Sequence, residues 1–180
     1  MKPETARLAA LGAVIEQDRK AVERWNRELE TLRSALGVAQ PPFRDLAAAA
    51  YALHNLYNAL ENTFEQVSRT FENHVTDPQQ WHKELLAKMF LDIPRVRPAV
   101  LPESLRAHLS DLRGFRHLFR HAYGFELDAE KVNRLVRDWR SARPAVLEAL
   151  THFRDRLLAQ VERADSDAAR LKRKAEKLKF

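Results

Sequence analysis

A strict apolar repeat between residues 46 and 71 constrains the fold of this chain more than any other feature. Apolar side chains recur there in alternating steps of four and three residues: Leu46, Ala50, Leu53, Tyr57, Leu60, Phe64, Val67 and Phe71. This spacing keeps all of them on one side of an α-helix, and it is typical of the seam between neighbouring helices in a bundle. The repeat therefore predicts a central helix that other helices cover.

Helical periodicity also marks the segments on either side of this repeat. Residues 3–36 predict one long helix, with Pro3 in the first turn and Gly37 after the last. Pro41 and Pro42 then break the chain, and Pro42 suits the first helical position of the central helix.

Proline and capping residues divide the second half of the chain. Helices are predicted from about Pro78 to Phe90, from Pro102 or Glu103 to Gly124, and onward from Asp128 as an N-cap. Three prolines between residues 92 and 102 indicate an extended connection. Pro144 predicts that the last helix is kinked or split near residues 141–143.

Composition agrees with a folded, all-helical chain. Of 180 residues, 45% are hydrophobic, enough for one core, and the four glycines leave little material for hairpin turns. We expect an all-α, up-and-down bundle of five to six helices that forms a single domain over residues 1–180. The chain has no Cys, which excludes disulfides and thiolate metal sites. No apolar run has the roughly 20 residues that span a bilayer, so we expect a cytoplasmic protein without a membrane partner.

Net charge says little about function, because most of it lies at one end. The chain carries a formal +6, and residues 170–180 hold six Lys or Arg against one Glu. The basic helical tail at residues 165–180 is typical of a solvated helix end, and contact with phosphates is the alternative.

The predicted helix before Gly124 contains the chemically unusual residues. Its apolar repeat places a guanidinium, that of Arg116, in a core position, which is costly unless the charge is paired or faces a polar cleft. The same turns carry four further groups that bind phosphate or transfer protons: Arg113, His117, Arg120 and His121. A basic helix end that complements the helix dipole is the alternative interpretation.

Residues 116–123, RHLFRHAY, resemble the signature of the HEPN superfamily, and specifically of the HepT-like ribonuclease toxins. The motif is an Arg, four residues, a His, one residue and a Tyr, late on a bundle helix. The resemblance extends from about Arg44 to Leu157, and the long first helix and the basic tail are less distinctive.

This resemblance implies metal-independent cleavage of RNA at a site that a homodimer assembles, with no cofactor. RNA supplies its own nucleophile, so the enzyme needs proton-transfer groups and a cation for the phosphorane. His121 is the predicted proton-transfer residue and Arg116 the phosphate clamp, with His117 as a second proton-transfer group or phosphate contact. Arg113 and Arg120 are predicted RNA contacts. His117 and His121 lack a third ligand in this segment, so no metal site is expected.

Geometry explains why a dimer belongs to this hypothesis. Five residues turn a helix by about 140°, so Arg116 and His121 of one chain point in different directions. Two copies that cross at a two-fold axis each lend one residue to a shared cleft. On the central helix, Glu61 and Asn58 border the apolar stripe. Glu61 is placed to orient His121 or to pair with Arg116, and Asn58 to contact RNA; ordinary surface hydrogen bonding is the alternative for both.

Tyr123 completes the motif. In HepT-like toxins this tyrosine receives a nucleotide from a cognate nucleotidyltransferase antitoxin, and added AMP would block RNA by bulk and negative charge. Two functions therefore stay open: a homodimeric endoribonuclease neutralised by that antitoxin, or a non-catalytic helical module that binds a nucleotidyltransferase or RNA.

Overall fold

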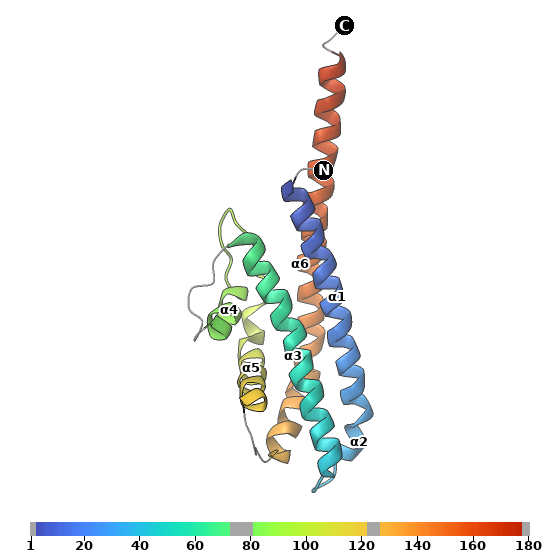
Figure 1. Ribbon diagram of the computed structural model, residues 1–180, viewed down its shortest axis with the longest axis vertical. Coiled ribbons are helices and arrows are strands. Elements are labelled where there is room, and N and C mark those ends of the chain that lie inside the picture. Colours follow the sequence, from blue (N-terminus) through green and yellow to red (C-terminus); the bar gives the residue numbers. More distant parts are fainter. Residues whose placement is uncertain (1–2, 73–80, 122–126, 178–180) are drawn as a thin grey trace.

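The protein is a bundle of helices, as the apolar repeats predict. The computed structural model describes residues 3–72, 81–121 and 127–177, and all regular elements in these ranges are helices. Three long helices run side by side and two shorter ones cover one flank of the central helix (Figure 1). The elements are α1 (Pro3–Thr31), α2 (Arg33–Leu36), α3 (Phe43–Phe71), α4 (Trp81–Met89), the 3-10 turn η1 (Glu103–Leu105), α5 (Arg106–His121) and α6 (Ala129–Lys177).

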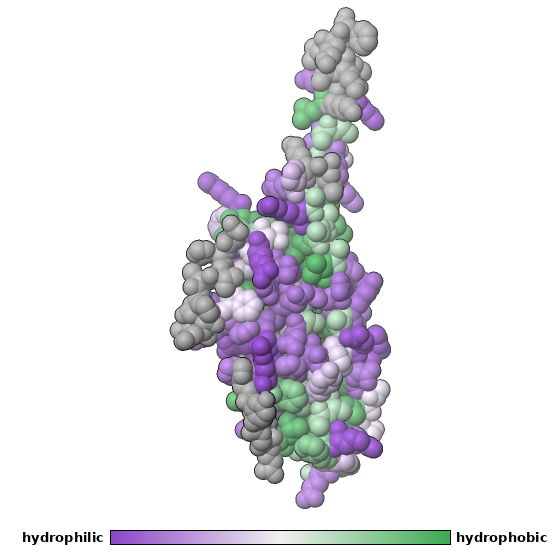
Figure 2. Space-filling model, in the orientation of Figure 1, coloured by the Kyte–Doolittle hydropathy of each residue, from purple (hydrophilic) through white to green (hydrophobic). Residues whose placement is uncertain are grey.

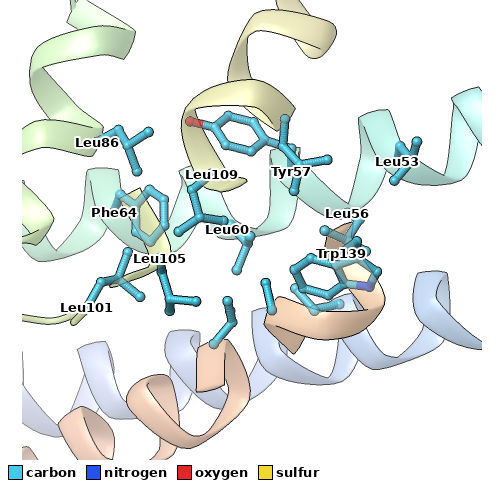
Figure 3. Packing of buried hydrophobic residues seen from close by; sticks show 14 of the residues in the cluster. Leu53, Leu56, Tyr57, Leu60, Phe64, Leu86, Leu101, Leu105, Leu109 and Trp139 are labelled. Atoms are coloured by element: carbon cyan, nitrogen blue, oxygen red, sulfur yellow. The ribbon is translucent and has the colours of Figure 1, made fainter. Parts of the chain in front are cut away.

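The predicted central helix is α3, and its apolar repeat forms the middle of the core. Leu53, Tyr57, Leu60 and Phe64 are all fully buried. Figure 3 shows these side chains pointing among residues of η1, α4, α5 and α6, including Leu105, Leu86, Leu109 and Trp139. The strict repeat therefore gives α3 contacts with every long element of the bundle.

The first helix ends earlier than the sequence predicts. Instead of one helix over residues 3–36, α1 ends at Thr31 and α2 begins at Arg33. The Thr31 hydroxyl donates to the Glu28 carbonyl at 2.7 Å. Only Leu32 lies between the two helices, and its φ of −86° and ψ of −3° stay in the right-handed helical region.

The last helix passes through its proline. A split near residues 141–143 was one of two predicted alternatives, and it is wrong because α6 is one helix from Ala129 to Lys177 with Pro144 inside it. Asp128 caps the start as predicted, since its Oδ1 accepts the backbone N–H groups of Glu130 and Lys131. Packing of Ala142 and Val146 against the core holds both sides of Pro144 in place.

The connection at residues 92–102 is non-helical as predicted, but it is not simply extended. Ile93 and Arg97 form a single β-bridge around a tight turn in which Arg95 has a φ of 66°. The Arg97 side chain is buried and holds this turn against the ends of α3 and α4.

The far end of α6 extends past the rest of the bundle (Figure 1). From residue 162 to 171 every side chain is exposed, including Leu171 at 67%. The basic tail is thus helical as far as Lys177, and its side chains at residues 165–171, 173 and 174 are exposed. Among the described residues, no helix combines the length and the apolar character needed to cross a membrane.

Candidate functional site

Arg116 lies on the inner face of α5, in the core position that the sequence pattern assigns to it. Its side chain is only 9% exposed, and its charge is balanced by an equally buried partner from α3, the carboxylate of Glu61. Arg116 NH2 lies 2.7 Å from Glu61 Oε2. Of the two roles predicted for Glu61, pairing with Arg116 is the one that this geometry shows.

Two further side chains complete the surroundings of the guanidinium. Arg116 Nε donates to Asn58 Oδ1 at 3.0 Å, and NH1 lies 3.3 Å from His82 Nε2. His82 comes from α4, and its Nδ1 lies 2.8 Å from Glu61 Oε1. Arg116, Glu61 and His82 thus form a closed ring of polar contacts across three helices: one ion pair, between Arg116 and Glu61, and two hydrogen bonds that His82 makes to the other two residues. Two of the five guanidinium N–H groups are thus used in hydrogen bonds to Asn58 and His82, and NH2 lies beside the Glu61 carboxylate.

The tautomer of His82 follows from this ring. A guanidinium only donates, so the NH1 contact requires His82 Nε2 to accept, which places the ring proton on Nδ1. A proton at Nδ1 is the one that the Glu61 carboxylate accepts. Both contacts therefore agree on a proton at Nδ1 and on an Nε2 that faces Arg116 as an acceptor.

His54, on α3, extends the cluster on the other side of Asn58. Asn58 Nδ2 donates to His54 Nε2 at 2.9 Å, and the ring packs against Phe119 of α5, with centroids 5.3 Å apart. Burial lowers the pKa of His54, and the positive charges of Arg116 and Arg120 lower it further. A neutral His54 fits its role as acceptor for Asn58, which in turn orients Arg116.

The position of α4, and with it His82, depends on a buried clamp. Arg97 donates to Glu72 Oε1 just after α3, and to the Lys88 carbonyl near the end of α4. Its NH1 also donates to the carbonyls of Leu91 and Pro98. One fully covered guanidinium therefore ties the ends of α3 and α4 together, and this fixes the helix that carries His82.

Three buried polar atoms in or beside the cluster have no hydrogen-bond partner among the described residues: the Tyr57 hydroxyl, Arg113 Nε and His54 Nδ1. Figure 3 shows the Tyr57 hydroxyl pointing toward α5. Burial raises the pKa of Tyr57, and the nearby Glu61 carboxylate raises it further. The phenol is thus held neutral, and the cationic side chains of α5 lie close to it.

The other predicted site residues of α5 divide into two groups. His117 and Arg120 are exposed, and Arg113 is half-buried. The side chain of His121 and the whole of Tyr123 lie outside the described residues, so their predicted roles stay predictions. Figure 2 shows polar residues gathered where α3 and α5 meet, with apolar residues over the lower part of the bundle.

His82 is the member of the cluster that the sequence alone did not predict. Proline and capping residues predict a helix from about Pro78 to Phe90, but no feature of that segment marks the residue after Trp81 as part of a site. No local pattern links residue 82 to residues 61 and 116. Only the packing of α4 against α3 and α5 brings the three together.

Comparison with known proteins agrees with this architecture. A family model described as HepT-like protein matches residues 48–157, which include Arg116, Glu61 and His82. Because the match covers more than half of the chain, the protein belongs to the HepT-like family. No curated protein and no solved structure matches the chain.

Proposed function

We propose that the protein is a metal-independent endoribonuclease of the HepT-like toxin type, which acts as a homodimer. The observation that carries the proposal is the buried guanidinium of Arg116, which Glu61 and Asn58 hold in one orientation. An arginine with a fixed fork is suited to the non-bridging oxygens of a phosphodiester. Family membership supports the same chemistry.

The chemical step uses the 2′-OH of RNA as its nucleophile. His121, five residues after Arg116, takes the proton of that hydroxyl, and Arg116 stabilises the charge of the phosphorane. His117, Arg120 and Arg113 lie along the same helix, where they contact RNA on either side of the cleaved bond. No metal or cofactor takes part in this proposal.

The test is cleavage of RNA by purified protein in the presence of EDTA. Arg116→Ala and His121→Ala should each lower the rate by a factor of at least about 100, the size of effect expected for lost charge stabilisation or proton transfer. Circular dichroism checks that each variant keeps its helices. Full activity of either variant would show that residues 116–123 do not form a catalytic motif.

Control by a nucleotidyltransferase forms the second part of the proposal. The partner enzyme adds AMP to Tyr123, and the new phosphate competes with RNA for the arginines of α5. Incubation with ATP, Mg²⁺ and the partner, followed by intact-mass measurement, should show AMP on the wild type and none on Tyr123→Phe. An equal mass gain on both proteins would place the modification elsewhere.

The ion pair also favours a second candidate function. Because Glu61 neutralises Arg116, the cluster is equally suited to a purely structural role in a non-catalytic module that binds RNA or a nucleotidyltransferase. The EDTA assay separates the two: a module binds without cleaving.

A further inference from the structure

We propose that His82 is the proton donor to the leaving 5′-oxygen in RNA cleavage. This inference rests on the proposed ribonuclease function and adds a residue from α4, outside the family motif. The carboxylate of Glu61 holds His82 Nδ1 at 2.8 Å, and His82 Nε2 lies 3.3 Å from Arg116 NH1. A phosphate oxygen bound by Arg116 therefore comes within hydrogen-bond reach of His82 Nε2.

The carboxylate and imidazole form a dyad of the kind that orients proton-transfer histidines. Glu61 fixes the tautomer and stabilises an imidazolium when one forms, without itself taking the proton. The His82 side chain is 32% exposed, compared with 8% for Glu61. Glu61 is thus buried, and part of the His82 side chain reaches the surface.

The proposed step places a proton on His82 Nε2 when RNA is bound. With a neutral His82, Glu61 and Arg116 cancel each other, so the ring carries no net charge. A phosphodiester adds one negative charge, and a proton on Nε2 restores neutrality. In that state Nε2 no longer accepts from Arg116 NH1, and the proposal has both nitrogens donate to the bound phosphate instead. The charged groups that contact His82 are Glu61 and Arg116, while Arg113 and Arg120 act on the neighbouring Tyr57 and His54.

Cleavage of the phosphodiester bond moves two protons. The 2′-oxygen attacks phosphorus and gives its proton to His121, while the bond from phosphorus to the 5′-oxygen breaks and that oxygen takes the Nε2 proton of His82. The products are a 2′,3′-cyclic phosphate and a free 5′-hydroxyl. His121 and His82 thus end the step with exchanged protonation states, and water restores them.

A substrate with sulfur in place of the leaving 5′-oxygen tests this role directly. A thiolate leaves without protonation far more readily than an alkoxide, because a thiol is much the stronger acid. His82→Ala should slow cleavage of ordinary RNA by at least about 100-fold but cleavage of the sulfur substrate by less than about 5-fold. Arg116→Ala should slow both by a similar factor, since the phosphorane needs its cation in either case. Cleavage by the wild-type protein is first used to find one phosphodiester bond that it cuts. Both substrates then contain that bond in the same sequence.

Two further variants keep the test decisive. His82→Gln retains an amide that bonds Glu61 and Arg116 but transfers no proton, so it should be as slow as His82→Ala on ordinary RNA and recover on the sulfur substrate. The exposed His152 on α6 is the matched control, and His152→Ala should cleave both substrates at the wild-type rate.

The outcomes separate this inference from the function on which it rests. Wild-type-like cleavage by His82→Ala or His82→Gln, or equal losses on both substrates, would overturn the role of His82 while cleavage by the wild type upholds the ribonuclease. A wild-type protein that cleaves no RNA would overturn both.

Discussion

Arg116 and Glu61 form a buried ion pair that affects both the stability of the bundle and the candidate site. Each side chain is more than nine-tenths buried. Removal of one partner leaves the other charge without compensation in the core, and this usually costs more than the pair itself contributes. The pair is therefore sensitive to single substitutions and tolerant of matched ones.

A double-mutant cycle measures this coupling. Glu61→Gln and Arg116→Met should each lower the free energy of unfolding by about 2–4 kcal/mol, and the double variant should lose at least about 1 kcal/mol less than their sum. Urea unfolding of the wild type, the two single variants and the double variant at pH 7 gives the free energies that the cycle needs. Additive losses would mean that the two charges do not interact in solution.

Asp18, at the contact of α1 with α3, provides a prediction for pH. Burial raises its pKa above 3.8, and hydrogen bonds from Thr63 and Asn62 offset part of that effect. The folded protein therefore holds this proton more tightly than the unfolded chain does. The titration of Asp18 does not change the free energy of unfolding below about pH 3.8. This free energy falls as the pH rises from there toward the pKa of Asp18 in the folded protein, and it stays lowered at higher pH.

Asp18→Asn removes this loss and keeps an oxygen for both donors. Its advantage over wild type in the free energy of unfolding should therefore be larger at pH 7 than at pH 4, as measured by urea unfolding. Asp111→Asn, at an exposed position of α5, is the control and should show little change with pH. An advantage for Asp18→Asn that shrinks as the pH rises would contradict the assigned direction.

At the scale of elements, periodicity predicted most of the fold. The apolar repeat of α3 and the Asp128 cap of α6 are local signals, and both are confirmed. Arg116 was predictable as an anomaly because a charge interrupted the repeat. The partnership with His82 was not, since it depends on how α4 packs rather than on spacing along the chain.

The continuous helix α6 shows where tertiary packing outweighs a local signal. Pro144 lacks the N–H that would bond the carbonyl of residue 140, and its ring crowds that carbonyl. Buried residues on both sides, Ala142 and Val146, nevertheless keep α6 helical. The proline therefore remains as a local cost within a helix that the core stabilises.

Replacement of this proline should make the protein more stable. Residue 144 is exposed, so Pro144→Ala restores a hydrogen bond without loss of buried area and should raise the free energy of unfolding by about 1–3 kcal/mol. Pro42→Ala is the matched control: Pro42 has a φ of −56° before α3, which suits proline, and its loss should be neutral or slightly destabilising. A loss of stability in Pro144→Ala would show that the ring contributes to packing.

At the scale of the whole molecule, the proposed dimer determines how many chains build one active site. Within one chain, Arg116 faces α3 and α4. Five residues turn a regular helix by about 140°, so we expect Arg116 and His121 to serve different sites. If each site takes Arg116 from one chain and His121 from the other, two inactive variants can restore each other.

Mixed dimers of Arg116→Ala and His121→Ala provide that test. Random pairing of equal amounts makes about half of the dimers mixed, and each mixed dimer has one site with both residues intact and one with neither. Co-refolded protein should therefore regain about a quarter of wild-type cleavage, whereas a site built from one chain regains none. The control replaces His121→Ala with the Arg116→Ala, His121→Ala double variant, which offers no intact Arg116 to any site. Light scattering on the same samples checks that the mixture is dimeric, and activity at the level of the control would remove the shared site from the proposal.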